Sequence, residues 1–185
     1  MDTLLKNNGF KFHDERITVY KDLMNETVQI QPIYQLKDLN EATDHDFKYI
    51  WNEAMVGSLN APSSLTVEEQ LQSAKLELGT TYKDSCFIVF NNGKPIGITM
   101  PHIEPGTRCE GRVFYFGLIP DERGKGISRL LHLQTLNLLK KKFNATYYIG
   151  STSYTNKPML KTFKNNGCSV LERSKVYKRI NNTLI

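Results

Sequence analysis

The sequence contains no apolar run long enough to cross a membrane, no cysteine pair spaced for a metal ion and no internal repeat. The longest apolar run, residues 113–120, has eight residues and includes a glycine, whereas a membrane-spanning helix needs about 20. The three cysteines are an odd number without a Cys-x-x-Cys or Cys/His spacing, which indicates reduced thiols. These absences argue against membrane, disulfide-rich secreted and zinc-finger proteins.

The first residues, MDTLLKNNGF, also lack the basic and then apolar layout of a signal peptide. We therefore expect a cytoplasmic protein. A chain of 185 residues has the length of one domain, and no Pro/Gly/Ser-rich linker divides it. We expect a single domain over residues 1–185, in which residues 1–30 form an N-terminal extension of uncertain structure.

Acidic residues are scarce in the second half of the chain. Residues 1–84 hold 8 Lys/Arg and 14 Asp/Glu, whereas residues 85–185 hold 16 Lys/Arg and only 5 Asp/Glu. The overall net charge of +5 conceals this contrast. A basic half indicates a surface that faces an anion, which can be a nucleic acid, a phosphate-bearing cofactor or an acidic protein.

Two amphipathic helices are predicted in the first half. Thr43-x-x-Asp46 and Thr66-x-x-Glu69 are patterns at which helices begin, and Gly79 is where the second one ends. Apolar residues follow each pattern at helical spacing: Phe47, Ile50, Trp51, Ala54 and Met55, then Val67, Leu71, Ala74 and Leu78. Before these helices, residues 17–20 and 27–36 are expected to form strands.

The second half alternates strands and helices. Strands are expected at residues 86–90, 96–102, 112–119, 146–151 and 176–180 and around residue 170, with helices at 124–142 and from Asn156 to Gly167. Gly117 predicts a bulge or a close backbone approach. We therefore expect an α+β fold, in which hairpin strands and one strand–helix–strand crossover form a mixed sheet flanked by helices.

The segment from Arg123 to Ser128, RGKGIS, carries the clearest chemistry. It joins a predicted strand to a predicted helix, and its glycines let backbone N–H groups approach an anion at the positive end of that helix. A P-loop would need Gly at position 119 and Ser or Thr at 126, where Ile and Gly stand. A dinucleotide fingerprint would need Gly at position 129, where Arg stands. The segment predicts a phosphate site of a different kind.

This segment resembles the pyrophosphate loop of the GNAT superfamily of N-acetyltransferases. That loop reads Arg/Gln-x-x-Gly-x-Gly/Ala, and the chain offers Arg123-x-x-Gly126-x-Ser128. The order of the predicted elements fits the superfamily over about residues 30–180, with Asn156 at the head of the last short helix. The resemblance implies a mixed, mostly antiparallel sheet flanked by helices, with a central splayed parallel pair formed by residues 112–119 and 146–151.

The resemblance also implies acetyl-CoA as the cosubstrate and no metal ion. Its pantetheine arm would lie between the splayed strands and its diphosphate on the glycine-bearing loop. The N–H of Leu118 is the implied donor to the thioester carbonyl oxygen. The residues implied to contact the coenzyme are Leu118, Ile119, Arg123, Gly124, Lys125, Gly126, Ile127, Ser128, Asn156 and Phe163.

The catalytic groups are less clear than the cofactor loop. Members of the superfamily often use a Glu near the bulged strand as general base, and Glu110 is our leading candidate, with Glu104 and His102 as rivals. An ion pair with a neighbouring arginine is the simpler interpretation of Glu110. Many members place a Tyr acid seven residues after the Asn, where this chain has Phe163. Tyr154, or Ser153, is the candidate to replace it; alternatively the thiolate leaves unassisted.

The expected function is transfer of an acetyl group to a primary amine of a small molecule or peptide. The acceptor would be bounded by the first two helices and by residues 57–64 and 152–155. A non-catalytic CoA-binding regulatory or interaction module is the alternative, because Phe163 cannot donate a proton. A nucleic-acid binder is the third reading, but no recognition motif supports it. We expect no nucleic-acid or membrane partner, and a monomer or homodimer.

Overall fold

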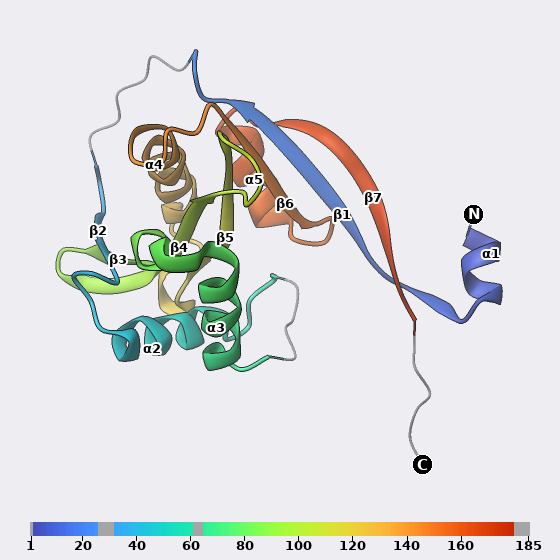
Figure 1. Ribbon diagram of the computed structural model, residues 1–185, viewed down its shortest axis with the longest axis horizontal. Helices are drawn as coiled ribbons and strands as arrows, with labels where there is room; N and C mark the ends of the chain where they lie inside the picture. The colour runs from blue at the N-terminus through green and yellow to red at the C-terminus, as the bar shows by residue number, and fades with distance from the viewer. Residues whose placement is uncertain (1, 26–31, 61–64, 180–185) are drawn as a thin grey trace.

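The computed structural model describes residues 2–25, 32–60 and 65–179 and has a seven-stranded sheet with helices on both faces (Figure 1). The strands are β1 (Phe10–Asp22), β2 (Gln35–Asp38), β3 (Phe87–Asn91), β4 (Lys94–Ile103), β5 (Glu110–Leu118), β6 (Tyr147–Ser153) and β7 (Ser169–Arg179). The helices are α1 (Asp2–Asn7), α2 (Asp44–Met55), α3 (Val67–Leu78), α4 (Ile127–Lys141) and α5 (Lys157–Asn165), with 3-10 turns η1 (Gly79–Ser85) and η2 (Pro120–Glu122).

The strand order is β2-β3-β4-β5-β6-β1-β7, and each neighbouring pair is antiparallel except β5 and β6. This mixed, mostly antiparallel sheet with one parallel pair confirms the predicted α+β fold class. None of the helices in the described ranges combines the length and the apolar composition that crossing a bilayer requires.

Helices α2 and α3 cover one face of the sheet, and both begin where the sequence predicts. The Thr43 side chain accepts the N–H of Asp46, and Thr66 and Glu69 form a complete capping box. The apolar stripe of α2 buries Phe47 and Trp51 completely against β3 and β4. Burial of two aromatic side chains stabilises this layer by about 2–3 kcal/mol each.

Helices α4 and α5 cover the opposite face. Leu131, Leu136 and Leu139 of α4 are completely buried against the sheet, and Phe163 of α5 packs in the same layer. The predicted helix start at residue 124 is wrong, because α4 begins at Ile127. Gly124 and Gly126 have positive φ angles of 74° and 78°, which a helix does not use.

The N-terminal strand lies inside the sheet. The expected strand at residues 17–20 is confirmed and is longer: β1 pairs with β6 on one edge and with β7 on the other. Its inward residues Ile17 and Val19 are buried. Residues 27–31 of the expected strand 27–36 lie outside the described residues, and β2 begins only at Gln35.

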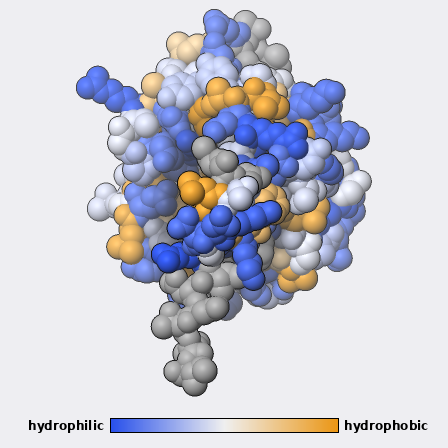
Figure 2. Space-filling model, turned by 90° about the vertical axis from the view of Figure 1, so that its right-hand side faces the viewer, coloured by the Kyte–Doolittle hydropathy of each residue, from blue (hydrophilic) through white to orange (hydrophobic). Residues whose placement is uncertain are grey.

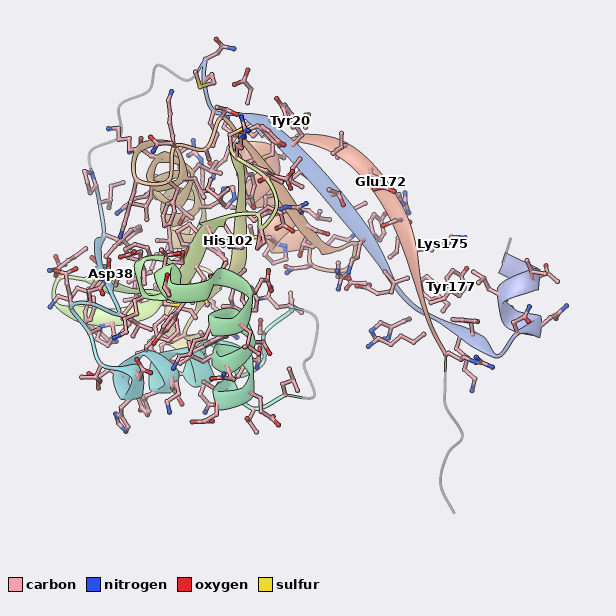
Figure 3. The ribbon with its side chains drawn as sticks, in the orientation of Figure 1. Tyr20, Asp38, His102, Glu172, Lys175 and Tyr177 are labelled. Carbon is pink, nitrogen blue, oxygen red and sulfur yellow. The ribbon has the colours of Figure 1, made fainter. Side chains whose placement is uncertain are left out.

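The far ends of β1 and β7 leave the body of the molecule as a two-stranded ribbon that ends at α1 (Figure 1). Glu172, Lys175 and Tyr177 lie along this ribbon (Figure 3). Most of β7 is exposed, and the face that carries the ribbon is largely hydrophilic, with scattered apolar residues (Figure 2). The predicted strands near 170 and at 176–180 are therefore one continuous strand up to Arg179, and residue 180 lies outside the described residues.

The central strands β5 and β6 diverge. They pair through Glu110 with Tyr147 and through Gly111 with Tyr148, so the rest of β5 has no partner strand on that edge among the described residues. A bulge bends β5 at Phe114 and Tyr115, which together oppose Met100 of β4. Thus the bulge predicted at Gly117 lies earlier in the strand. At Gly117 itself the space that a Cβ would need is filled by the ring of Tyr115, so this glycine makes room for a side chain; its carbonyl oxygen in turn occupies the space that a Cβ at Gly97 would need.

Candidate active site

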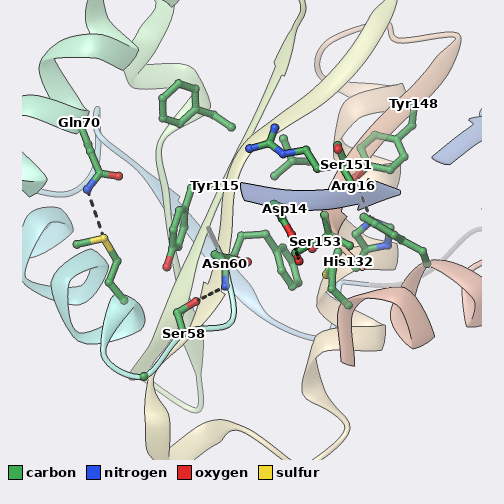
Figure 4. Close-up of a pocket in the computed structure, with 18 of the residues that line it drawn as sticks. Asp14, Arg16, Ser58, Asn60, Gln70, Tyr115, His132, Tyr148, Ser151 and Ser153 are labelled. Atoms are coloured by element: carbon green, nitrogen blue, oxygen red, sulfur yellow. Dashed lines mark hydrogen bonds between the residues drawn. The ribbon is translucent and has the colours of Figure 1, made fainter. Parts of the chain in front are cut away.

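Two cavities open where β5 and β6 diverge. The first, which we call the α4 cavity, has a volume of about 660 Å³ and lies at the N-terminus of α4; it includes Gly124, Gly126 and Ser128. The second, the β1 cavity, has a volume of about 630 Å³ and is lined from β1 by Asp14 and Arg16 (Figure 4). Both cavities are lined by Gly57, Ser58, Asn60, Phe116 and Met159. They therefore meet beside β5, and one ligand in each could touch the other.

The α4 cavity ends in a set of backbone donors. Gly126 is the N-cap of α4 in a left-handed conformation, and no side chain caps the helix. Within the described part of the chain, the N–H groups of residues 124–126 and of the first turn of α4 donate to no acceptor. A helix N-terminus with unpaired N–H groups carries a partial positive charge. These groups form a site suited to an anion.

Arg123 holds this loop in place. Its guanidinium donates to three backbone carbonyls: Nε to Leu118 (3.0 Å), Nη1 to Val56 (2.7 Å) and Nη2 to Ala54 (2.9 Å). Two of these carbonyls belong to the C-terminal end of α2, where a cation is favoured. The side chain therefore joins β5, α2 and the loop, and three of its five N–H donors are used in these contacts.

The open edge of β5 offers backbone groups to the α4 cavity. The N–H of Ile119 donates to Ile96 of β4 (3.0 Å), and in an antiparallel ladder alternate residues face the same neighbour. Leu118 and Phe116 therefore direct their N–H groups away from β4, toward the gap. The Phe116 carbonyl oxygen accepts from Asn60 Nδ2 (3.1 Å), which confirms this direction.

The other predicted cofactor residues are divided between the two cavities. Asn156 caps α5, because its Oδ1 accepts the N–H of Met159 (3.2 Å), and its Nδ2 donates to Asn60 Oδ1 (3.4 Å). It lines the α4 cavity together with Ile127 and Ser128. Phe163 is buried and lines the β1 cavity instead. Lys125 lines neither and forms an ion pair with Glu122 at 3.1 Å.

The β1 cavity contains one carboxylate among its described lining residues, that of Asp14. A bulge between Phe12 and Asp14 changes the register of β1 just before this residue. Asp14 Oδ1 accepts from Ser153 Oγ (2.7 Å) and from the N–H of Glu15 (2.8 Å). Arg16 follows two residues later, lines the same cavity and is exposed. A negative and a positive group therefore stand side by side at its wall.

Two tyrosines stand on opposite sides of the β1 cavity (Figure 4). The hydroxyl of Tyr115 on β5 donates to the carbonyl of Ala54 (3.2 Å). Tyr148 on β6 has its hydroxyl 3.5 Å from Nε2 of His132, a completely buried residue of α4. Burial raises the pKa of both phenols, so both keep their protons at neutral pH.

The predicted catalytic residues lie outside the linings of both cavities. Glu110 accepts from Arg112 Nε (2.6 Å) and from the Tyr147 hydroxyl (3.1 Å). Tyr154 is half-exposed, and the ammonium of Lys157 lies 3.4 Å from its ring centre. Their roles stay predictions, which these contacts do not favour. Ser153, the other proposed acid, does line the β1 cavity.

The rival bases form a separate group. One carboxylate oxygen each of Glu77 and Glu104 and a ring nitrogen of His102 lie within 4.8 Å of one another. His102 is buried, and burial lowers its pKa. Arg112 Nε lies 3.6 Å from Glu104, so a guanidinium already faces this carboxylate.

Comparison with family models decides the identity of this fold. The model of the acetyltransferase (GNAT) family matches residues 36–168, well over half of the chain. The chain belongs to the GNAT acetyltransferase family. This GNAT domain includes both divergent strands and the α4 loop, whereas β1 and β7 lie outside the matched residues. A comparison with curated proteins finds no relative.

Solved structures agree on the fold. A GCN5-related N-acetyltransferase from Sphaerobacter thermophilus matches with a TM-score of 0.67 at 15% identity, covering 95% of this chain and 54% of its own. A GNAT-family acetyltransferase from Colwellia psychrerythraea matches with a TM-score of 0.65 at 15% identity, and the match covers 95% of this chain and 59% of the other. A glucosamine N-acetyltransferase region of a fungal multi-domain β-N-acetylglucosaminidase matches with a TM-score of 0.69 at 12% identity, and the match covers 95% of this chain and 22% of the other. This chain thus spans between about a fifth and three fifths of the length of these chains.

Members of the GNAT family use acetyl-CoA as cosubstrate, and the α4 cavity fits this molecule. Its anion site has free backbone donors, and it is lined by Arg129 and Lys161 but by no carboxylate among the described residues. The unpaired edge of β5 supplies amide groups of the kind that an extended amide-bearing arm can pair with. The donor set therefore matches a diphosphate joined to a peptide-like chain.

Sequence reasoning missed the residues that β1 brings to the GNAT domain. Asp14 and Arg16 reach the cavity because β1 pairs with β6 about 130 residues away, and no motif signals that pairing. Tyr148 and His132 were also missed. A usable signal existed for the tyrosines: each divergent strand carries a Tyr-x-Gly sequence, Tyr115–Gly117 and Tyr148–Gly150.

Proposed function

We propose that the protein transfers the acetyl group of acetyl-CoA to a primary amine of a small molecule or peptide. The observation that carries this proposal is the junction of two cavities at the unpaired edge of β5, one ending in the anion site of α4 and the other containing a carboxylate. Acetyl-CoA would supply an activated acyl thioester at that junction.

The residues of the α4 cavity hold the coenzyme in this proposal. The N–H groups of residues 124–128 bind its diphosphate, with Arg129 and Lys161 nearby. Arg123 acts indirectly, since its guanidinium keeps the loop against α2. The N–H of Leu118, which faces the gap, is the donor that would stabilise negative charge on the carbonyl oxygen. Removal of one such donor in other enzymes costs about 3–4 kcal/mol of transition-state stabilisation.

The β1 cavity receives the acceptor. An ordinary primary amine has a pKa near 10, so it arrives almost entirely as a cation, and a carboxylate both attracts it and can accept its proton. Asp14 is the described carboxylate of this cavity, and we propose it for that role. Glu110 remains the alternative predicted from the sequence, acting from outside the cavity through water.

The test measures CoA binding and turnover separately. Isothermal titration calorimetry with CoA should show binding, and Gly126→Val should abolish it, because a side chain there strains a φ of +78° in the loop that presents the free N–H groups. Gly106→Val is the matched control: its φ is +84°, with no neighbour within 4 Å, in a turn away from both cavities. Equal losses in the two variants would contradict the anion site.

A panel of amines with acetyl-CoA then distinguishes the enzyme from a CoA-binding module. Release of free thiol that depends on an added amine, with an acetylated product detected by mass spectrometry, supports acetyl transfer. Binding of CoA without turnover on any amine would favour the alternative, a regulatory or interaction module. The second candidate is supported by Phe163, because this side chain has no proton to donate to a departing thiolate.

A further inference from the structure

A chain of buried polar groups behind the β1 cavity determines where each proton lies. It begins at Asn166, whose Nδ2 lies 2.9 Å from the carbonyl oxygen of Arg129 and 2.9 Å from His132 Nδ1. A carbonyl oxygen only accepts, so the amide must present its nitrogen here and not its oxygen. Its second hydrogen therefore points at His132 Nδ1, which must be the acceptor.

His132 is neutral in this position. Its ring is completely buried, which lowers its pKa to about 3. A neutral imidazole has one N–H, and since Nδ1 accepts, the hydrogen is on Nε2. Nε2 lies 3.5 Å from the Tyr148 hydroxyl, so His132 is the donor in this contact and the tyrosine oxygen is the acceptor.

The hydrogen of the Tyr148 hydroxyl is left without an acceptor. Among the described residues, His132 Nε2 is its one hydrogen-bond partner, and that atom carries its own hydrogen. The ring is held by edge contacts with His132 (5.4 Å between ring centres) and Phe163 (6.4 Å). Because Tyr148 lines the β1 cavity and an unused buried donor is costly, this hydrogen is available to a ligand.

Tyr115, on the opposite wall, differs in this respect. Its hydroxyl hydrogen is engaged by the Ala54 carbonyl. Phe163, at the position where the family often has a tyrosine, packs directly against Tyr148 and has no hydroxyl. The two strands thus present one engaged and one available phenol to the same cavity.

We propose that Tyr148 is a catalytic residue whose hydroxyl donates a hydrogen bond to the sulfur of the coenzyme, with His132 and Asn166 as positioning residues. This inference rests on the proposed function. In the transfer, a nitrogen–carbon bond forms, the carbon–sulfur bond breaks and its electron pair stays on sulfur, while the proton lost by the amine leaves through Asp14 or water. Tyr148 keeps its proton and stabilises the charge on sulfur.

The test needs no acceptor amine. It compares, by calorimetry at pH 9, binding of CoA with binding of desulfo-CoA, which lacks the sulfur. A hydrogen bond from the phenol favours the thiolate form of the bound coenzyme, and a hydrogen bond to a charged group is worth about tenfold in affinity or more. The wild-type protein should therefore prefer CoA by at least about tenfold. Tyr148→Phe should lose most of this preference while its affinity for desulfo-CoA stays unchanged.

Tyr115→Phe is the matched control and should keep the wild-type preference. His132→Phe, which retains an aromatic ring but not the N–H donor, should reduce the preference without altering desulfo-CoA binding, and it serves as the second variant if Tyr148→Phe fails to fold. The inference is overturned if the wild-type protein binds both ligands equally, or if Tyr148→Phe or His132→Phe prefers CoA as strongly as the wild type. Absence of binding by either ligand to the wild type would instead refute the proposed function.

Discussion

The hydroxyl oxygen of Tyr148 occupies the space that a Cβ atom at residue 150 would need, so the tyrosine lies flat along its own strand over Gly150. Tyr115 lies over Gly117 in the same manner on β5. Each divergent strand therefore uses a glycine to let a tyrosine fold down beside the gap, and this placement keeps both phenols at the walls of the β1 cavity.

Gly150→Ala should destabilise the protein by about 1–3 kcal/mol, because the new methyl group displaces a tightly packed ring. Urea unfolding followed by tryptophan fluorescence measures this loss. Tyr148→Leu in the same chain should recover part of it, so the double variant should be less destabilised than the sum of the single ones. Strict additivity would show that the two residues do not compete for space.

Arg123→Gln should lower the free energy of unfolding by about 2–4 kcal/mol, because three backbone carbonyls lose a charged donor. Arg129→Gln, in the same cavity, is the control: it should weaken CoA binding with little change in stability. The two variants are compared by urea unfolding and by calorimetry with CoA. Equal stability of the two would refute the structural role of Arg123.

Acid should destabilise the protein before its carboxylates titrate. Burial lowers the pKa of His132 to about 3, whereas the unfolded chain takes up this proton near pH 6.5, so stability is lost as the pH falls from 6.5 toward 3. Burial lowers the pKa of His102 as well. Between pH 6.5 and 5 the loss from His132 should be about 1.5 kcal/mol. His132→Gln should have a shallower dependence of Tm on pH over that interval.

Cys86 should resist alkylation in the folded protein. Burial raises the pKa of its thiol to about 12, so almost no thiolate exists at pH 8. Cys109 and Cys168 are partly exposed and should react first with iodoacetamide. Peptide mass spectrometry gives the order of modification, and all three should react in urea. Rapid labelling of Cys86 without denaturant would contradict the burial.

Asp14→Asn should lower kcat, raise the KM for the acceptor amine by about tenfold or more and leave CoA affinity unchanged, because the amine loses both its charged partner and its proton acceptor. The measurement uses whichever amine the panel identifies. Glu110→Gln serves as the comparison, since it removes a carboxylate that is paired with Arg112 and Tyr147. If Glu110→Gln alone lowers kcat, the base is Glu110 and Asp14 has no catalytic role.

Local sequence signals located most elements of this fold. The capping patterns at Thr43 and Thr66 and Asn156 before α5 act through neighbours in the chain, and each occurs where it was expected. The glycines at 124 and 126 predicted the anion loop, although not that the helix starts only at Ile127.

Partners distant in the chain were beyond such signals. Arg123 looked like a phosphate ligand, and its guanidinium also donates to two carbonyls at the C-terminal end of α2, which no local pattern indicated. Glu110 looked like a base, but Tyr147 and Arg112 hold it. In both cases the residue type indicated a possible role, but the sequence could not predict which group would face that residue in the folded protein.

Most helices and strands after residue 40, the glycine-bearing loop and the resemblance to the family could be read from the chain alone, because they depend on backbone conformation and on hydrophobic spacing over a few residues. The entry of β1 into the sheet between β6 and β7, and the meeting of Asp14, Tyr148 and His132 at one cavity, emerge only in the folded protein. Strand pairing joins segments more than 100 residues apart through backbone hydrogen bonds, and these are the same for every sequence.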